Sequence, residues 1–231
     1  MNLKIIVAFA LVAVTVRGNV ALSQVEPTEI LYATPGVERF VVAGLRIGDD
    51  FEQVKVFLQY KALNAIPEKA KMSTIRGNKS NYAMPYLGSQ KYTNGKSGVN
   101  EITATLTFTP PLETSKGMSP LVREICYETF FGEGISAEEV MRDLEKKYGK
   151  HDTTYGNDPI GTSKWFLQGK SKYPINVMEV FLVPSFKAGE RGRLMIRISD
   201  STFTDNTFAR AREYVDKRDA DRMKDTTKPT F

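Results

Sequence analysis

Residues 132–149 read GEGISAEEVMRDLEKKYG, and residues 44–54 read GLRIGDDFEQV. Both stretches run from a glycine through an isoleucine to a polar residue that can begin a helix, and then to a valine. In the later stretch, Ser136 and Glu139 have the spacing of a capping box, in which each side chain accepts a hydrogen bond from a free backbone N–H of the first turn. Asp50 and Gln53 repeat this spacing. The sequence therefore predicts two helices that begin in the same way.

Apolar residues follow both caps at helical spacing. The later helix carries Val140, Met141, Leu144 and Tyr148 on one face, and the earlier helix carries Phe51, Val54, Phe57 and Leu58. Gly149 is placed to end the later helix, because glycine adopts the backbone conformation of a C-cap without steric cost. Both helices are therefore predicted to be amphipathic, with one face directed at a core.

Each predicted helix is followed by a turn-rich stretch and then by strands. Residues 102–108 alternate apolar side chains with threonines, the pattern of a half-buried strand, and two prolines separate them from a second strand at 121–130. In the second half the predicted strands are 165–167, 177–183 and 194–198. The order of helix, loop, strand and hairpin thus occurs twice. It favours an internal duplication over a chance recurrence of short signals.

We therefore predict an α+β protein of two similar halves, each a helix with an antiparallel sheet, with the helices on one face of the sheet and a further helix at the C-terminal end. The first half covers residues 39–131 and opens with a short strand at 39–42; the second half covers residues 132–203. Residues 204–231 hold the closing helix and a tail. Residues 24–38 contain two prolines and no periodicity, which is typical of a leader or linker.

Residues 1–23 have the pattern of a secretory signal peptide. A short positive start precedes an apolar run at 5–16, and Ala21-Leu22-Ser23 supplies a small-x-small cleavage site. The apolar run is shorter than the about 20 residues that a membrane span needs; an uncleaved anchor is the alternative. No later segment is apolar enough to cross a membrane. We expect cleavage after Ser23 and a periplasmic or secreted protein.

The overall charge is mild. The chain has 32 basic and 27 acidic side chains, a formal net charge of +5, and loss of Lys4 and Arg17 with the signal peptide would leave +3. This excess is too small to indicate a nucleic-acid partner. The single cysteine, Cys126, excludes a disulfide within the chain, and a chain of this length can bury enough apolar surface without one. Absence of such crosslinks suits a bacterial periplasm.

Two short segments carry a resemblance to known families. Gly44-Leu45-Arg46-Ile47-Gly48-Asp49 running into a helix, and residues 144–150 before a new strand, resemble the small envelope proteins of the SmpA/OmlA type. They also resemble the secreted β-lactamase-inhibitory protein family, which has two tandem helix-plus-antiparallel-sheet units. The chain lacks the lipidated cysteine of the former and the cysteine pairs of the latter. The resemblance implies a fold and a habit of binding other proteins, and it brings no catalytic residue.

Groups suited to catalysis are few. His151 follows the expected end of a helix, where a cation complements the helix dipole, so a structural role is favoured over catalysis. Cys126 lies in a predicted strand, where a thiol is usually a small buried side chain. One histidine and one cysteine cannot build a zinc site, and no metal or cofactor is predicted. Asp216, Asp219 and Asp221 alternate with basic residues, which is typical of a solvated helix face.

One region stands out by its charge. Residues 61–96 hold seven basic side chains and a single acidic one, Glu68, together with tyrosines among Asn, Gly, Ser and Pro. Tyrosines in loops offer broad contact area and lysines attract acidic partners, so we predict a binding loop at 69–92. A plain connection with its tyrosines packed on the sheet is the alternative. The candidate binding residues are Lys69, Lys71, Arg76, Lys79, Tyr82, Tyr86, Lys91 and Tyr92.

The sequence thus predicts an exported, non-catalytic binding or adaptor protein of the bacterial cell envelope. Its partner would be an envelope protein or an anionic surface, met through the 69–92 loop and the open face of the sheet. The alternative is an exported hydrolase in which Glu124 and Glu128, or Glu179, form a carboxylate pair. A hydrolase requires these carboxylates to meet in a cleft.

Overall fold

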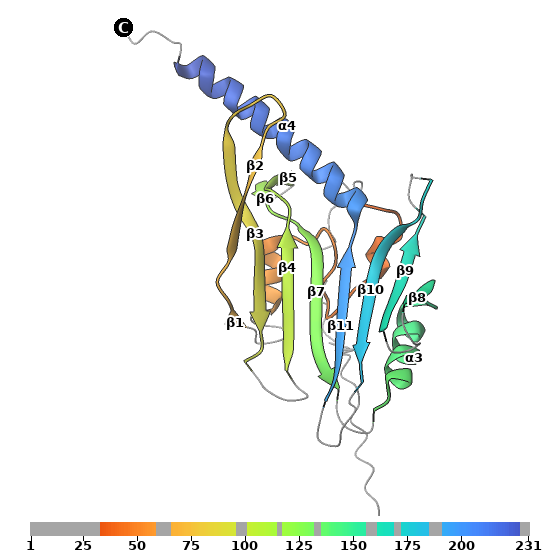
Figure 1. Cartoon of the computed structure of the whole chain (residues 1–231). Helices are drawn as coiled ribbons and strands as arrows, with labels where there is room; N and C mark the ends of the chain where they lie inside the picture. The colour runs from red at the N-terminus through yellow and green to blue at the C-terminus, as the bar shows by residue number, and fades with distance from the viewer. Residues whose placement is uncertain are drawn as a thin grey trace, which may run out of the picture.

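The computed structural model of the chain describes residues 33–58, 66–95, 101–114, 117–131, 135–155, 161–168, 172–184 and 191–226. These residues form an antiparallel sheet of nine strands, a small two-stranded sheet and three α-helices, the last at the C-terminal end (Figure 1). The predicted α+β class is confirmed.

Up to residue 131 the elements are η1 (Val37–Arg39), α2 (Phe51–Val56), β1 (Ile66–Pro67), β2 (Lys71–Arg76), β3 (Ala83–Thr93), β4 (Ile102–Phe108), β5 (Leu112–Thr114), β6 (Gly117–Ser119) and β7 (Val122–Phe131). After residue 131 they are α3 (Ala137–Tyr148), β8 (Thr153–Tyr155), β9 (Gly161–Leu167), β10 (Ile175–Val183), β11 (Gly192–Ser199) and α4 (Ser201–Thr226).

The strands of the large sheet follow the order β1-β3-β4-β7-β11-β10-β9-β8, and β2 also pairs with β3. All of these pairs are antiparallel. The centre of the sheet is the β7–β11 pair, which joins strands far apart in the sequence. Cys126 of β7 lies opposite Thr105 of β4 on one side and Arg197 of β11 on the other. The edges are β1 and β2 at one end and β8 at the other.

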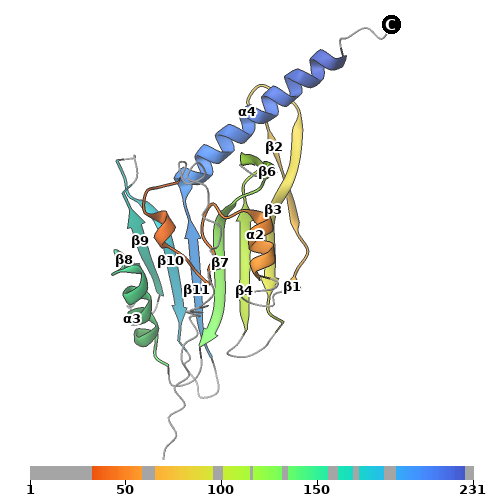
Figure 2. The ribbon, with the colours of Figure 1, turned by 180° about the vertical axis from the view of Figure 1, so that it is seen from behind.

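Alternation of side chains decides which face of the sheet is covered. In β4 the fully buried Ala104, Leu106 and Phe108 alternate with partly exposed threonines, as the sequence predicts. Helices α2 and α3 lie on the same face of the sheet (Figure 2). The opposite face, which we call the open face, carries the threonines of β4 and the charged residues of β7 and β11.

The predicted helix caps are confirmed. The Asp50 carboxylate accepts hydrogen bonds from the backbone N–H groups of Glu52 and Gln53 at the start of α2. Ser136 and Glu139 form the reciprocal capping box of α3, and Gly149 ends this helix with a positive φ of 88°. Capping groups of this kind typically contribute about 1 kcal/mol each.

The segment before α2 differs from its prediction. Residues 39–42 are not a strand: Val37–Arg39 form a 3-10 turn, and Val42 makes only an isolated bridge to Leu45. Residues 33–38, expected in a leader, pack against the protein. Val37 is buried, and the backbone N–H and hydroxyl of Thr34 donate to the Asp200 carboxylate at 2.6 and 2.9 Å. The sequence pattern failed to predict this segment because hydrogen bonds to side chains, rather than pairing with a neighbouring strand, hold it in place.

The closing helix is confirmed and is longer than expected. It begins directly after β11, where the same Asp200 carboxylate caps it by accepting from the backbone N–H of Phe203. Phe203, Ala211 and Val215 are fully buried. Both views show α4 running diagonally across one end of the sheet toward the turn between β2 and β3 (Figures 1 and 2).

Candidate binding surface

The region predicted as a binding loop is a β-hairpin at the edge of the sheet. We call residues 66–93 the edge hairpin; it consists of β1, β2, a turn and β3. Five of the six residues of β2 are exposed, and only Ile75 is buried. A strand that covers so little core is polar in sequence, and its Lys, Ser, Thr and Arg content therefore resembled that of a loop.

The basic residues of the edge hairpin are on its surface. Lys69, Lys71, Arg76 and Lys79 are all exposed. Among the described residues, none of these four side chains has a carboxylate within ion-pair distance. Lys91 differs, because its ammonium lies 2.9 Å from Glu68, the one acidic residue of the hairpin. This hydrogen bond raises the pKa of Lys91.

The tyrosines of the edge hairpin do not form a contact surface. Tyr86 and Tyr92 are only 6% and 1% exposed, so both belong to the core. Burial raises the pKa of Tyr92 to about 12. Tyr86 packs edge-on against Phe208 of α4. Tyr82 is partly exposed and lies beneath the Arg222 guanidinium, 5.1 Å from its ring centre. The alternative in which the tyrosines pack on the protein therefore describes Tyr86 and Tyr92.

A carboxylate of α4 holds the turn of the edge hairpin. Asp216 accepts hydrogen bonds from three consecutive backbone N–H groups, those of Asn78, Lys79 and Ser80, at 2.9 to 3.0 Å. The Ser80 hydroxyl donates to Asp219, one helical turn further on, at 2.7 Å. A side chain at Gly77 would overlap the Asp216 carboxylate. The turn is therefore fixed on α4.

These two aspartates were expected on a solvated helix face, and that expectation is wrong for both. The available signal was weak: Gly77-Asn78 marks a turn after a strand, and Asp216 and Asp219 are three residues apart on one helix face. Sequence spacing alone could not bring the two segments together, because they are separated by about 140 residues in the chain.

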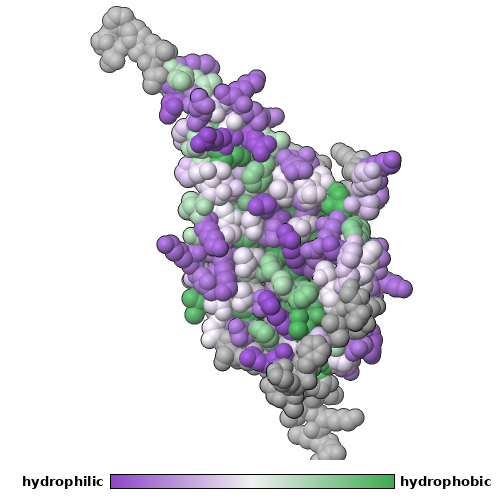
Figure 3. All heavy atoms as spheres, in the orientation of Figure 1, coloured by the Kyte–Doolittle hydropathy of each residue, from purple (hydrophilic) through white to green (hydrophobic). Residues whose placement is uncertain are grey.

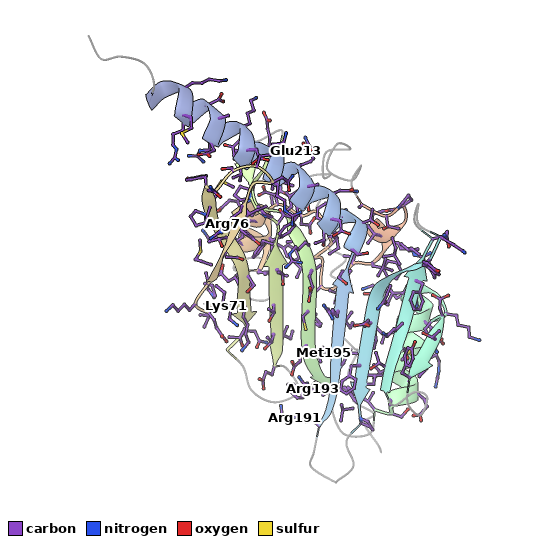
Figure 4. All side chains as sticks on the ribbon, turned by 45° about the horizontal axis from the view of Figure 1, so that its top comes forward. Lys71, Arg76, Arg191, Arg193, Met195 and Glu213 are labelled. Carbon is purple, nitrogen blue, oxygen red and sulfur yellow. The ribbon has the colours of Figure 1, made fainter. Side chains whose placement is uncertain are left out.

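The open face of the sheet carries charges that are paired across strands. The Arg193 guanidinium binds both oxygens of Glu128 at 2.8 and 3.0 Å. Arg197 lies 3.0 Å from Glu124. Glu179 of β10 accepts from Lys164 at 2.9 Å. Figure 3 shows this face as a mixture of hydrophilic and hydrophobic side chains, and Figure 4 shows Arg193 and Met195 well apart from Lys71 and Arg76.

The three glutamates proposed for the hydrolase alternative all lie on this open face. Burial alone would raise the pKa of Glu179, but hydrogen bonds from Lys164 and Asn176 lower it overall. Glu124 and Glu128 are each hydrogen-bonded to an arginine. All three carboxylates are therefore bound to cations on the surface of the sheet.

The contacts of Cys126 and His151 are those of structural rather than catalytic residues. Burial, assisted by the negative charges of Glu124 and Glu128, raises the pKa of the Cys126 thiol, which makes it a weaker nucleophile near neutral pH. The ring nitrogens of His151 lie 2.8 Å from the Glu145 carboxylate and 2.8 Å from the Thr154 hydroxyl. The imidazole therefore links the end of α3 to β8.

The described residues contain neither a metal-binding cluster nor a membrane-spanning helix. No group of three or more His, Cys, Asp or Glu side chains in this part of the chain is arranged to hold a metal ion. No helix within these ranges has the length and apolar character needed to cross a membrane.

Comparison with known proteins adds no assignment. No protein-family model matches the chain, and the searches of curated proteins and of solved structures found no significant match.

Proposed function

We propose that the protein is an exported, non-catalytic binding or adaptor protein of the bacterial cell envelope that recognises an acidic surface on a protein partner through the edge hairpin. The observation that carries this proposal is the group of four exposed cations at Lys69, Lys71, Arg76 and Lys79, which have no carboxylate partner in the described part of the chain. Unpaired cations are available to a partner without first breaking an internal ion pair.

The proposed contact surface differs from the predicted one. Because Tyr86 and Tyr92 are buried, the surface consists of the four cations and of exposed apolar groups such as Met72, which is 66% exposed. Lys91 contributes less, since Glu68 already neutralises it. Such a surface relies on charge for attraction and orientation, with a small apolar contribution to affinity.

The arrangement of the open face favours binding over the hydrolase alternative. Glu124, Glu128 and Glu179 each bind an arginine or lysine. Using any of them as a general acid would first require breaking its ion pair. The same face, with its cross-strand pairs and partly exposed Phe181, is a second surface on which a protein partner could pack.

We also propose that the chain arose by internal duplication. Strand order supports this: after α2 the strands run from the β1–β2 edge through β3 and β4 to β7, and after α3 they run from the β8 edge through β9 and β10 to β11. Each series begins with a helix and proceeds from an edge to the centre. The resemblance to tandem α+β families stays a prediction.

Export itself depends on residues 1–23, which lie outside the described residues. We expect the protein recovered from the periplasm or medium of a bacterial host to begin at Gln24. Its intact mass measures this directly. A protein that retains residues 1–23 and stays with the cytoplasmic fraction would contradict this part of the proposal.

The binding proposal is tested with a fourfold charge variant. Lys69, Lys71, Arg76 and Lys79 are all changed to serine, and partners are isolated from periplasmic and membrane extracts at low salt. A matched control changes Arg142, Lys146, Lys150 and Lys172 to serine, which removes the same charge from exposed sites elsewhere.

We expect the hairpin variant to lose a specific protein partner that the control retains. Identical partners for both variants would refute the hairpin as the recognition surface. Binding of both proteins to vesicles that contain anionic phospholipid is measured in parallel. If only vesicle binding depends on the hairpin, the partner is an anionic membrane surface and the proposal of a protein partner is wrong.

A further inference from the structure

The outer side of β2 is a free edge of the sheet. Strand β2 pairs with β3 through residues Lys71–Arg76, and no other described strand pairs with it. β1, which precedes it, also pairs only with β3. An edge strand of this kind presents unpaired backbone N–H and C=O groups, to which another extended chain can add.

The register identifies the backbone groups that point outward. Thr74 lies opposite Pro85, and proline has no N–H to donate to a ladder. Hydrogen-bonded and non-hydrogen-bonded pairs alternate in an antiparallel ladder, so the bonds between the strands run through Ser73–Tyr86 and Ile75–Met84. The backbone groups of Met72, Thr74 and Arg76 therefore point away from β3. They offer three N–H donors and three C=O acceptors in a row.

The side chains beside this edge are cationic and therefore favour an acidic partner. Lys71 and Arg76 mark the two ends of β2 (Figure 4), and Lys69 and Lys79 flank the strand. Edge lysines discourage pairing between copies of a protein, because two like-charged edges repel. A second copy of this chain would bring the same four cations together. An extended segment rich in Asp or Glu would instead be attracted along its length.

The hairpin is also held in place before any partner binds. The three hydrogen bonds to Asp216 fix its turn, and Met84 and Tyr86 of β3 are buried. A preformed edge reduces the ordering that binding requires, because only the incoming segment must lose conformational freedom.

From the free edge and its unpaired cations we infer that β2 binds an acidic, extended segment of a protein partner as an additional strand of the sheet. This inference rests on the proposed function and specifies how the partner is recognised. It requires both the outward backbone groups of Met72, Thr74 and Arg76 and the cations around them.

The test uses the full mature chain and synthetic, fluorescently labelled peptides. One peptide alternates Glu with Val; a second has the same sequence with N-methyl groups on the amides that would face β2; a third has Lys in place of Glu. Binding is measured by fluorescence anisotropy at low and at moderate salt. We expect only the first peptide to bind, with an affinity that falls as salt rises.

The matched protein variants separate backbone pairing from charge. Thr74→Pro removes an outward N–H and leaves the β2–β3 ladder intact, so it should weaken binding about tenfold without changing the unfolding midpoint. The pair Lys71→Ser and Arg76→Ser should weaken binding and reduce its salt dependence. Should Thr74→Pro perturb folding, amide exchange in the unaltered protein decides: the peptide should slow exchange at Met72, Thr74 and Arg76.

The outcomes distinguish the two proposals. Equal binding of the acidic peptide and its N-methylated form, or unchanged exchange at the three amides, would refute strand addition while leaving charge-based recognition by the hairpin intact. No binding of the acidic peptide at its highest soluble concentration would also refute strand addition. If sedimentation shows self-association that Thr74→Pro abolishes, the edge pairs with a second copy and the acidic partner is wrong.

Discussion

The open face and the edge hairpin use similar residues in opposite ways. On the open face, Arg193, Arg197 and Lys164 each bind a glutamate on a neighbouring strand. On the edge hairpin, four cations have no carboxylate partner in the described part of the chain. Charge on the open face is therefore largely used within the molecule, whereas charge on the hairpin is available to other molecules.

A count of charges along a sequence therefore does not locate a binding surface. Both regions contain lysines and arginines at strand positions. The strand register distinguishes the two regions. On the open face it places Glu128 opposite Met195 and Glu124 opposite Ser199, so that each glutamate lies within reach of an arginine on β11. The hairpin has one carboxylate, and Lys91 uses it. Four experiments test this contrast between the open face and the edge hairpin.

The largest effect should come from releasing the hairpin from α4. Asp216→Ala leaves three backbone N–H groups without their acceptor, and should lower the free energy of unfolding by about 2 kcal/mol. Gly77→Ala should have a similar effect by displacing the carboxylate. Urea unfolding measures both. Asp221→Ala is the control, since Asp221 is more than half exposed and, within the described residues, pairs with Lys224 alone at 3.3 Å; it should change stability little.

The next effect concerns the best-formed ion pair of the open face. A double-mutant cycle of Glu128→Ala and Arg193→Ala should give a coupling free energy of up to about 1 kcal/mol, because the pair is bidentate and partly buried. The same cycle on Glu52 and Lys55, which are 3.7 Å apart and more exposed, should give a coupling near zero. Equal couplings would mean that the open face gains no stability from its pairing.

A smaller effect should appear in the pH dependence. The pKa of Glu179 is lowered from 4.5, so the folded protein binds this proton more weakly than the unfolded chain. The stabilisation is fully present above 4.5 and is lost as pH falls below it. Glu179→Gln should therefore destabilise the protein by less than about 1 kcal/mol at pH 7, and by less still in acid.

Unfolding curves at several pH values are measured for the Glu179→Gln variant and for the unaltered protein. The hairpin variant with four serines provides the contrast, since its four cations have no carboxylate partner in the described part of the chain. The difference in the free energy of unfolding between this variant and the unaltered protein should be constant with pH. A Glu179→Gln difference that is equally constant would show that this ion pair does not contribute in the folded state.

The smallest change in stability should come from removing the hairpin cations. Substitution of Lys69, Lys71, Arg76 and Lys79 by serine should alter the free energy of unfolding by no more than about 0.5 kcal/mol in total, because these side chains bind nothing within the described protein. The variant should instead self-associate more readily through the exposed edge. Light scattering measures this; a large loss of stability would show that the cations have internal roles.

Much of the fold could be predicted from the sequence. The N-cap at Asp50, the capping box at Ser136, the alternation of residues 102–108 and the closing helix depend on neighbours within a few residues, and all are confirmed. The strand predicted at 39–42 is wrong because groups distant in the sequence hold this segment. Of the leader or linker predicted at 24–38, the described Thr34 and Val37 pack on the protein. Thr34 binds Asp200, and the Tyr148 hydroxyl donates to the carbonyl of Val41.

The candidate site was predicted in part. The cations of 69–92 are exposed, but the hairpin that carries them was not expected, since its polar edge strand resembles a loop in composition. Tyr86 and Tyr92 were expected on the surface because tyrosine tolerates either environment. The structure shows which environment applies: Tyr86 packs against Phe208 of α4, and Tyr92 is buried in the core. Asp216, which positions the turn, gave only a weak local signal, its spacing of three residues from Asp219 on one helix face.

The bond between Thr34 and Asp200 also bears on how the chain folds. These residues are 166 positions apart, and a ribosome makes Thr34 long before Asp200 exists. During that interval Thr34 lacks its Asp200 partner, and the segment around it is not yet held in place. Folding controlled by contacts this distant in sequence is slow, which makes the nascent chain a natural client for chaperones.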